Sequence, residues 1–168
     1  DAFIDWAMAQ PTGRYELVEG RVVAISPQPV AHALVKGAVW DALARAIRDA
    51  GVAGEMFPNG PSVVVDDATV YEPDALVRCG APLDREAVRV PDPVVVVEVL
   101  SPSTQAADLG GKLEGYFRLA SVRHYLIVKT ATRSVIHHWR DDAGDLRTAI
   151  LTAGALALYP PGLRLDVE

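Results

Sequence analysis

The chain has 168 residues, of which 50% are hydrophobic and 23% charged, and we expect one globular domain spanning residues 1–168. No apolar run approaches the roughly 18 residues of a membrane-spanning helix, so we expect no membrane partner. The net charge of −6 argues against a protein that binds nucleic acid only through a basic surface, although acidic metal ligands would themselves add negative charge.

The first half of the chain predicts a hairpin, a long helix and a pair of strands. Residues 15–18 and 21–25 flank Glu19-Gly20, which reads as a two-residue hairpin turn because glycine accepts a positive φ. Apolar residues then recur at helical spacing over 31–50, and Gly51 provides a stop. The segments 62–65 and 70–77 have the pattern of two strands paired across a turn.

The second half predicts a buried strand, a helix and further strands. Residues 93–100 are apolar except for Glu98, which is typical of a strand buried on both faces. A helix follows from an N-cap at Ser103 or Thr104 to about Ala120. This order of elements indicates an α/β fold with an N-terminal β-hairpin. The remaining predicted strands are 124–128, 134–139, 146–151 and 163–167.

Two acids and one lysine stand on neighbouring core elements. Glu98 interrupts the buried strand, Asp74 precedes the apolar residues 75–77, and Lys112 lies in the apolar stripe of the following helix. A buried carboxylate is costly unless a positive charge or a hydrogen-bond donor meets it. Consecutive elements usually lie side by side, so we expect Asp74, Glu98 and Lys112 to converge in one cleft.

Each of these residues also has a purely structural interpretation. A surface pair with Asp108, four residues earlier, is the alternative for Lys112. Glu98 has the alternative of a salt bridge at a strand end, and Asp74 that of a turn acid after Pro73. All three structural interpretations together are less favoured than each one alone, because the residues stand on consecutive elements, which usually lie side by side.

As a set, the three residues suit metal-dependent hydrolysis of a phosphodiester. Mg²⁺, or Mn²⁺ in its place, prefers hard oxygen ligands and often takes one or two carboxylates together with waters and a phosphate oxygen. Asp74 and Glu98 are therefore candidate metal ligands and catalytic residues. Lys112 is a candidate catalytic residue because an ammonium can orient the attacking water or stabilise transition-state charge.

Several motifs resemble the Uma-two family of restriction-endonuclease-like bacterial proteins. The most specific is VVVVEVLSPST at residues 94–104. The resemblance covers nearly the whole chain, and it implies the PD-(D/E)XK nuclease superfamily with its mixed β-sheet flanked by helices. The other matching segments are YELVEG at 15–20, Ser26-Pro27, His32, Pro73-Asp74, Asp108, Lys112 and Tyr116.

The resemblance assigns roles residue by residue. Asp74 matches the acid of the PD element, Glu98 matches the acid of the (D/E)XK element, and the carbonyl of Val99 is a further metal ligand by analogy. The chain departs from the superfamily pattern at Leu100, where a lysine is usual. The family pattern implies that Lys112, on the next helix, takes the place of that lysine.

Two further positions match the family with looser roles. The resemblance implies that Glu16 is an extra catalytic acid near the metal, and its alternative is an outward-facing hairpin residue. His32 falls on the inward stripe of its helix with Val35 and Val39, which predicts a hydrogen-bonded core histidine.

We therefore expect an endonuclease that uses Mg²⁺ or Mn²⁺ to hydrolyse DNA, with a homodimer by analogy to enzymes that cut both strands. Cys79 is the single cysteine, and the N-terminus has no signal-peptide pattern, which favours a cytoplasmic location. A second interpretation is a binding or regulatory module that keeps the nuclease fold but cleaves weakly or not at all. The acidic net charge favours this second interpretation.

Overall fold

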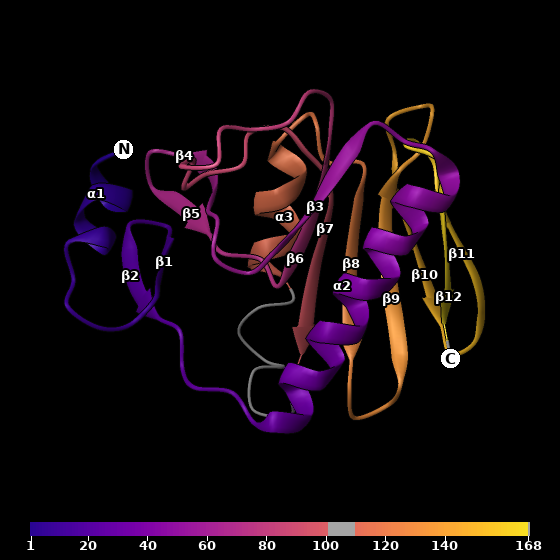
Figure 1. The fold of residues 1–168 in the computed structure, drawn as a ribbon, viewed down its shortest axis with the longest axis horizontal. Helices are drawn as coiled ribbons and strands as arrows, with labels where there is room; N and C mark the ends of the chain where they lie inside the picture. Colours follow the sequence, from indigo (N-terminus) through magenta and orange to yellow (C-terminus); the bar gives the residue numbers. More distant parts are fainter. Residues whose placement is uncertain (101–109, 168) are drawn as a thin grey trace.

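The computed structural model describes residues 1–100 and 110–167, and a six-stranded mixed sheet forms its centre (Figure 1). The strands are β3 (Gly54–Pro58), β6 (Ala75–Cys79), β7 (Pro93–Leu100), β8 (His124–Lys129), β9 (Ser134–Arg140) and β10 (Leu146–Leu151). Their order is β10-β9-β8-β7-β6-β3. The central neighbours β7 and β8 run parallel, whereas β6 and β9 run antiparallel to them.

Two smaller sheets lie at opposite sides of the central one (Figure 1). The N-terminal sheet has the order β2-β1-β5-β4, and the C-terminal sheet pairs β11 with β12. The predicted hairpin is confirmed, because both turn residues have the positive φ of a tight hairpin, 49° at Glu19 and 78° at Gly20. The elements are α1 (Ala2–Met8), β1 (Tyr15–Val18), β2 (Arg21–Ala24), β4 (Val63–Asp66), β5 (Thr69–Tyr71), β11 (Gly154–Leu158) and β12 (Leu163–Val167).

Helices α2 (Val30–Ala50) and α3 (Gly111–Arg118) pack on opposite faces of the central sheet. Val95 and Val97 of β7 belong to the apolar cluster that includes α2, and Val96 and Leu100 belong to the cluster that includes α3. Side chains alternate between the two faces of a strand, so Glu98 lies on the α3 face. This confirms the prediction that the strand at residues 93–100, which is β7, is buried on both of its faces.

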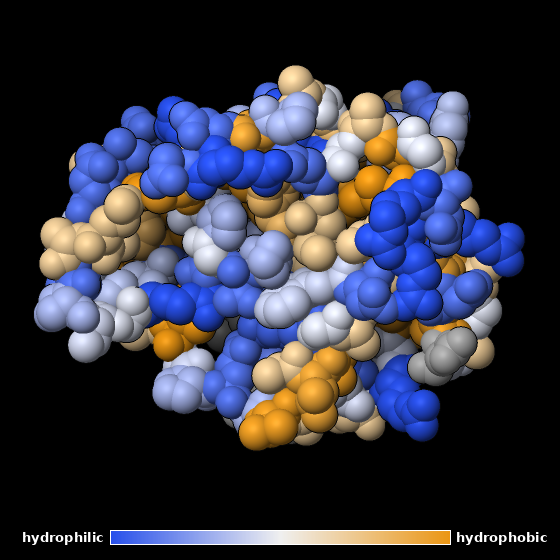
Figure 2. Space-filling view, in the orientation of Figure 1, coloured by the Kyte–Doolittle hydropathy of each residue, from blue (hydrophilic) through white to orange (hydrophobic). Residues whose placement is uncertain are grey.

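The outer side of α2 is apolar at its N-terminal end. Figure 2 shows this patch at the lower edge of the molecule, where Val30 is 77% and Leu34 69% exposed. His32, two residues after Val30, and Lys36, two residues after Leu34, are buried. A step of two residues turns a helix by about 200°, so the buried pair points toward the sheet.

Some sequence predictions need correction. The predicted strand 70–77 is divided between two sheets, because Glu72-Pro73-Asp74 separates β5 from β6 and proline cannot donate a ladder hydrogen bond. Elements α1, β3 and β11 were not predicted. The helix expected to end near Ala120 ends at Arg118, and its expected N-cap at Ser103 or Thr104 lies outside the described residues. No helix in the described ranges is long and apolar enough to cross a membrane.

Candidate active site

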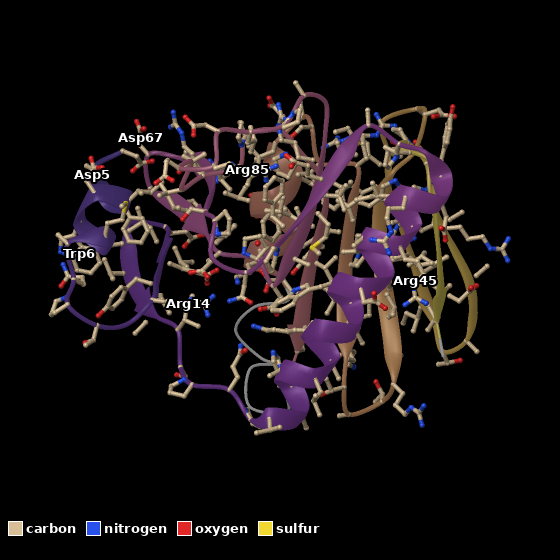
Figure 3. All side chains as sticks on the ribbon, in the orientation of Figure 1. Asp5, Trp6, Arg14, Arg45, Asp67 and Arg85 are labelled. Carbon is tan, nitrogen blue, oxygen red and sulfur yellow. The ribbon has the colours of Figure 1, made fainter. Side chains whose placement is uncertain are left out.

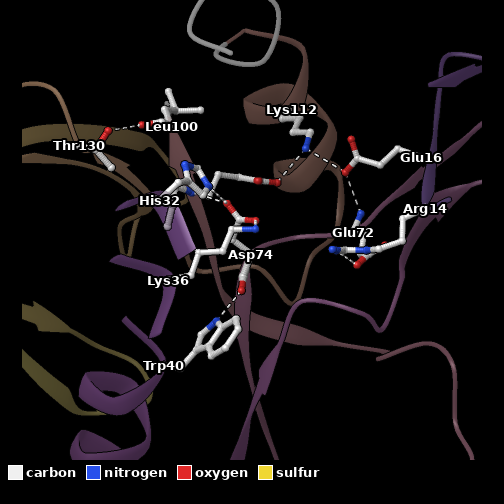
Figure 4. A network of polar contacts seen from close by, with 12 residues as sticks. Arg14, Glu16, His32, Lys36, Trp40, Glu72, Asp74, Leu100, Lys112 and Thr130 are labelled. Atoms are coloured by element: carbon white, nitrogen blue, oxygen red, sulfur yellow. Dashed lines mark hydrogen bonds and ion pairs between the residues drawn. The ribbon is translucent and has the colours of Figure 1, made fainter. Parts of the chain in front are cut away.

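The four predicted catalytic side chains reach one place from four different elements. Glu16 stands on β1, Asp74 just before β6, Glu98 on β7 and Lys112 on α3. All four residues are buried, with 6–7% of their surface exposed. Figure 4 shows the labelled Glu16, Asp74 and Lys112 gathered in this network. The convergence expected from the sequence is therefore present in the structure.

Strand register places the two candidate metal ligands side by side. In the antiparallel pair of β6 and β7, Ala75 lies opposite Val97, so one further step puts Asp74 beside Glu98. The backbone N–H of Val99 donates to Asp74 Oδ2 at 2.7 Å, which anchors the carboxylate against β7. Trp40 Nε1 donates to the backbone oxygen of Asp74 at 2.7 Å and fixes the same residue from α2 (Figure 4).

Lys112 connects the acids of two different sheets. Its Nζ lies 2.9 Å from Glu16 Oε1 and 3.0 Å from Glu98 Oε1. The same ammonium lies 5.5 Å from the ring centre of Tyr71, within the range of a cation–π contact. The lysine from α3 thus reaches the acid of the central strand. The alternative partner of Lys112, Asp108, lies outside the described residues.

Glu16 also fastens the chain segment that leads to Asp74. Its Oε1 accepts the backbone N–H of Glu72 at 2.8 Å. The Glu72 carboxylate is paired with Arg14, whose side chain lies between the N-terminal hairpin and the central sheet (Figures 3 and 4). Because Glu16 is only 7% exposed, the alternative of an outward-facing hairpin residue is wrong.

Burial makes the charge of Glu98 expensive. Desolvation is the largest cause that raises its pKa to about 8; Lys112 lowers the pKa, and the nearby carboxylates of Asp74 and Glu16 raise it. The hydroxyl of Tyr116 donates to Glu98 Oε1 at 2.8 Å. A cation next to Glu98 and Asp74 would offset this cost, and carboxylate oxygens are ligands that Mg²⁺ and Mn²⁺ accept. Both carboxylates are oxygen donors of the kind that a divalent ion accepts, but no group of three or more His, Cys, Asp or Glu side chains in the described part of the chain is placed to hold one.

Helix α2 contributes two buried polar residues whose contacts were not predicted. Lys36 Nζ lies 2.5 Å from Asp74 Oδ1, and His32 Nε2 lies 4.0 Å from Asp74 Oδ2. Burial lowers the pKa of His32, which favours the neutral imidazole. His32 is 4% exposed, so its predicted position in the core is confirmed, but among the residues that the structure describes neither of its ring nitrogens has the predicted hydrogen-bond partner. The spacing of His32, Lys36 and Trp40, four residues apart, is the sequence signal for one shared face.

A glycine permits the close approach of α3 that brings Lys112 into the site. A Cβ on Gly115 would lie 2.5 Å from the hydroxyl oxygen of Tyr71 and 2.7 Å from its ring. Tyr71 is 3% exposed and its ring packs 5.0 Å from that of Tyr116, so it has little room to move. The absence of a side chain at Gly115 is therefore a packing requirement.

We expect Gly115→Ala to lower the free energy of unfolding by about 1–3 kcal/mol, the usual cost of overpacking a core. Gly111→Ala is the matched control in the same helix, because a Cβ there meets no atom within 4 Å. Urea unfolding of both variants and the parent measures the difference. Equal stability of the two variants would mean that Tyr71 yields to the new methyl group.

Comparisons with known proteins agree on one family and one fold. The Uma2 (Uma-two) family model, described as a putative restriction endonuclease, matches residues 1–168. The uncharacterized protein slr1290 from Synechocystis sp. is 39% identical over 98 residues, which are 57% of this chain and 51% of that protein. The chain thus spans about half the length of this curated relative.

A solved structure resembles almost the whole chain. It is the crystal structure of a putative nuclease belonging to DUF820 from Anabaena variabilis, and the comparison gives a TM-score of 0.75 at 11% sequence identity. The match covers 98% of this chain and 93% of that chain. This likeness confirms the predicted mixed α/β fold class.

Proposed function

This chain belongs to the Uma2 family, and from that membership and the buried acid–lysine cluster we propose that it is a nuclease that hydrolyses DNA phosphodiester bonds with Mg²⁺ or Mn²⁺. The observation that carries the proposal is the position of Lys112. Its ammonium contacts Glu98 at 3.0 Å on the strand where the superfamily lysine is missing. A solvated surface lysine would make no such buried contact.

The metal would be held by Asp74, Glu98 and the backbone carbonyl of Val99. When bound, the divalent ion supplies Lewis acidity toward water and the phosphoryl oxygens. These three groups offer only oxygen atoms, which suits a hard cation. Asp74 is fixed before any ion arrives, because its carboxylate already accepts the N–H of Val99 and its backbone oxygen accepts from Trp40.

Lys112 would act on the reacting atoms. Its ammonium lies at the Glu98 carboxylate, where it can donate a hydrogen bond to the attacking water or to a phosphoryl oxygen as negative charge develops. Glu16 holds the ammonium from the other side at 2.9 Å and is itself held by the backbone N–H of Glu72. Glu16 is thus a positioning residue for Lys112 in this proposal.

A nuclease-fold module without efficient cleavage is the second candidate, and the net charge of −6 favours it. It requires neither Lys112 nor a bound ion. The two candidates therefore differ in what the ion does to the protein and in whether DNA is cut. A homodimer, which would allow both strands to be cut, belongs to the nuclease proposal.

Metal binding can be tested through thermal stability. An ion that binds only the folded state stabilises it, and an ion at about ten times its Kd adds about 1.4 kcal/mol. We expect Mg²⁺ or Mn²⁺ to raise the Tm of the parent by about 3 °C or more. Glu98→Ala should lose most of this rise.

Asp67→Ala is the control for that experiment, because Asp67 is an exposed acid in the turn between β4 and β5 (Figure 3). It removes the same charge, and it should respond to the ion as the parent does. An identical metal response in the parent and in Glu98→Ala would exclude Glu98 as a ligand.

A further inference from the structure

Strand β10 ends the central sheet with an unprotected edge. It pairs with β9 over six consecutive residues without a bulge, and among the described residues none forms a backbone hydrogen bond to its other edge. Such an edge offers a row of unpaired N–H and C=O groups to another strand. The other edge strands of the two larger sheets are protected by a proline, a bulge or short length: β3 ends at Pro58, β4 has a bulge after Val64, and β2 has four residues.

One face of β10 is also apolar and open. Leu146, Thr148 and Ile150 share the α3 face of the sheet, because Thr148 Oγ1 contacts His138 Nδ1 at 2.7 Å and Ile150 lies opposite Ile136, which packs against the cluster that includes α3. Helix α3 does not cover this end of the face, since Leu146 is 51% and Ile150 70% exposed. Large apolar side chains that stand together on a surface mark an interaction site.

The C-terminal hairpin leaves this face free. Leu156 and Leu158 of β11 and Leu163 of β12 belong to the apolar cluster that includes α2. Strands β11 and β12 therefore pack on the α2 side of the central sheet. The α3 face of β10 stays accessible to a partner.

We propose that β10 pairs with β10 of a second copy of this chain, antiparallel about a two-fold axis at Thr148. Leu146 and Ile150 stand two residues before and two residues after Thr148, so this axis places Leu146 opposite Ile150 of the partner subunit, and the reverse pair follows by symmetry. Directly opposite side chains of paired strands are about 4.5–5.5 Å apart at Cβ, close enough for the four apolar side chains to cover one another. The inference deepens the homodimer that belongs to the proposed function, and it concerns association alone.

The charges of β10 select this register. The axis places Arg147 opposite Ala149 of the partner subunit, and Arg147 pairs with Asp141 of its own chain. An axis one residue earlier would place two copies of Arg147 directly opposite each other, and like charges in that position are destabilising. An axis one residue later would put Leu146 opposite Thr152 of the partner subunit, which loses the apolar contact.

Sedimentation equilibrium tests the association. An interface built on one strand is small, so we expect the parent to dimerise with a Kd of about 1–100 μM. Ile150→Arg places a guanidinium against Leu146 of the partner subunit and should raise this Kd at least about tenfold. Leu34→Arg is the matched control, because Leu34 is 69% exposed on α2 and carries no part of the proposed interface. It should keep the Kd of the parent.

A disulfide across the axis tests the register. In a Cys79→Ala background, two Thr148→Cys side chains would stand on Cα atoms about 4.5–5.5 Å apart, a distance that a disulfide spans. Mild oxidation should therefore convert this variant to a covalent dimer. Val22→Cys in the same background is the control, because Val22 is 50% exposed on the edge strand β2, and it should stay largely unlinked.

Three results would overturn the inference: a parent that is monomeric at about 0.1 mM, an Ile150→Arg variant that dimerises as the parent does, or a Thr148→Cys variant that crosslinks no faster than Val22→Cys. None of these variants alters the acid–lysine cluster. Failure of the dimer therefore leaves the proposed cleavage site standing, and a parent that dimerises through β10 without cutting DNA overturns only the proposed function.

Discussion

Replacing Lys112 with alanine is expected to lower the rate of DNA cleavage by about 10²–10³-fold, the usual loss when one hydrogen-bond donor to developing charge is removed. Binding of Mn²⁺ should be nearly unchanged, because Asp74 and Glu98 hold the ion. The separation follows from the roles, since an interaction made mainly in the transition state affects the rate and not ground-state binding. Single-turnover cleavage and calorimetric titration of the same preparation measure the two effects.

The fold of this variant needs its own control. Removing one partner of a buried ion pair costs about 3–5 kcal/mol, and Lys112 is paired with both Glu16 and Glu98. Lys112→Met keeps the volume of the aliphatic stem, and Lys129→Met removes an equivalent charge from the end of β8. Circular dichroism confirms that each variant is folded. If Lys112→Met cleaved DNA as fast as Lys129→Met, the catalytic role of the ammonium would be refuted.

Replacing Asp74 with asparagine is expected to abolish metal binding and cleavage together. Asparagine has nearly the same shape and can still accept the hydrogen bond from Val99 N–H through its amide oxygen. It loses the negative charge that attracts the ion and pairs with Lys36. We expect the Kd for Mn²⁺ to rise more than about tenfold and cleavage to fall below about one hundredth of the parent rate.

Asp67→Asn is the matched control for this change at an exposed position, and it should leave both quantities unchanged. The contrary result would be an Asp74→Asn variant that binds Mn²⁺ as the parent does. Asp74 would then be a structural residue that anchors β6 against β7 and α2.

The sequence predicts much of this site because strands impose strict geometry. A run of valines interrupted by Glu98 has one interpretation as a buried strand, and alternation along that strand assigns the acid to a face. Asp74 lies beside Glu98 because β6 pairs with β7 in a register that the apolar pattern of both strands supports. The inward orientation of Lys112 follows from its place in the apolar stripe of its helix.

Other parts of the site depend on tertiary packing that no local pattern specifies. Lys36 lies in a long helix where a lysine usually faces solvent, and although its spacing from His32 and Trp40 places the three residues on one face, that spacing does not show that the face is buried against Asp74. The chain crosses from one sheet to another at Pro73, and the apolar residues on both sides of that proline favoured one strand, although the proline itself is a signal for a break. The close packing of Gly115 against Tyr71 lets α3 approach β5, and these two residues are far apart in the chain.

The central claim is tested most directly by cleavage of supercoiled plasmid DNA. The parent, Asp74→Asn, Glu98→Ala and Lys112→Met are purified identically, so that a contaminating nuclease would affect all four equally, and each is assayed with Mn²⁺, Mg²⁺ and a chelator. We predict that the parent converts the plasmid to nicked or linear form only with a metal ion, and that the three variants do so at least about 10²-fold more slowly. Equal cleavage by all four preparations, or none by the parent on double- or single-stranded DNA with either ion, would contradict the nuclease assignment and favour a binding module on the same fold.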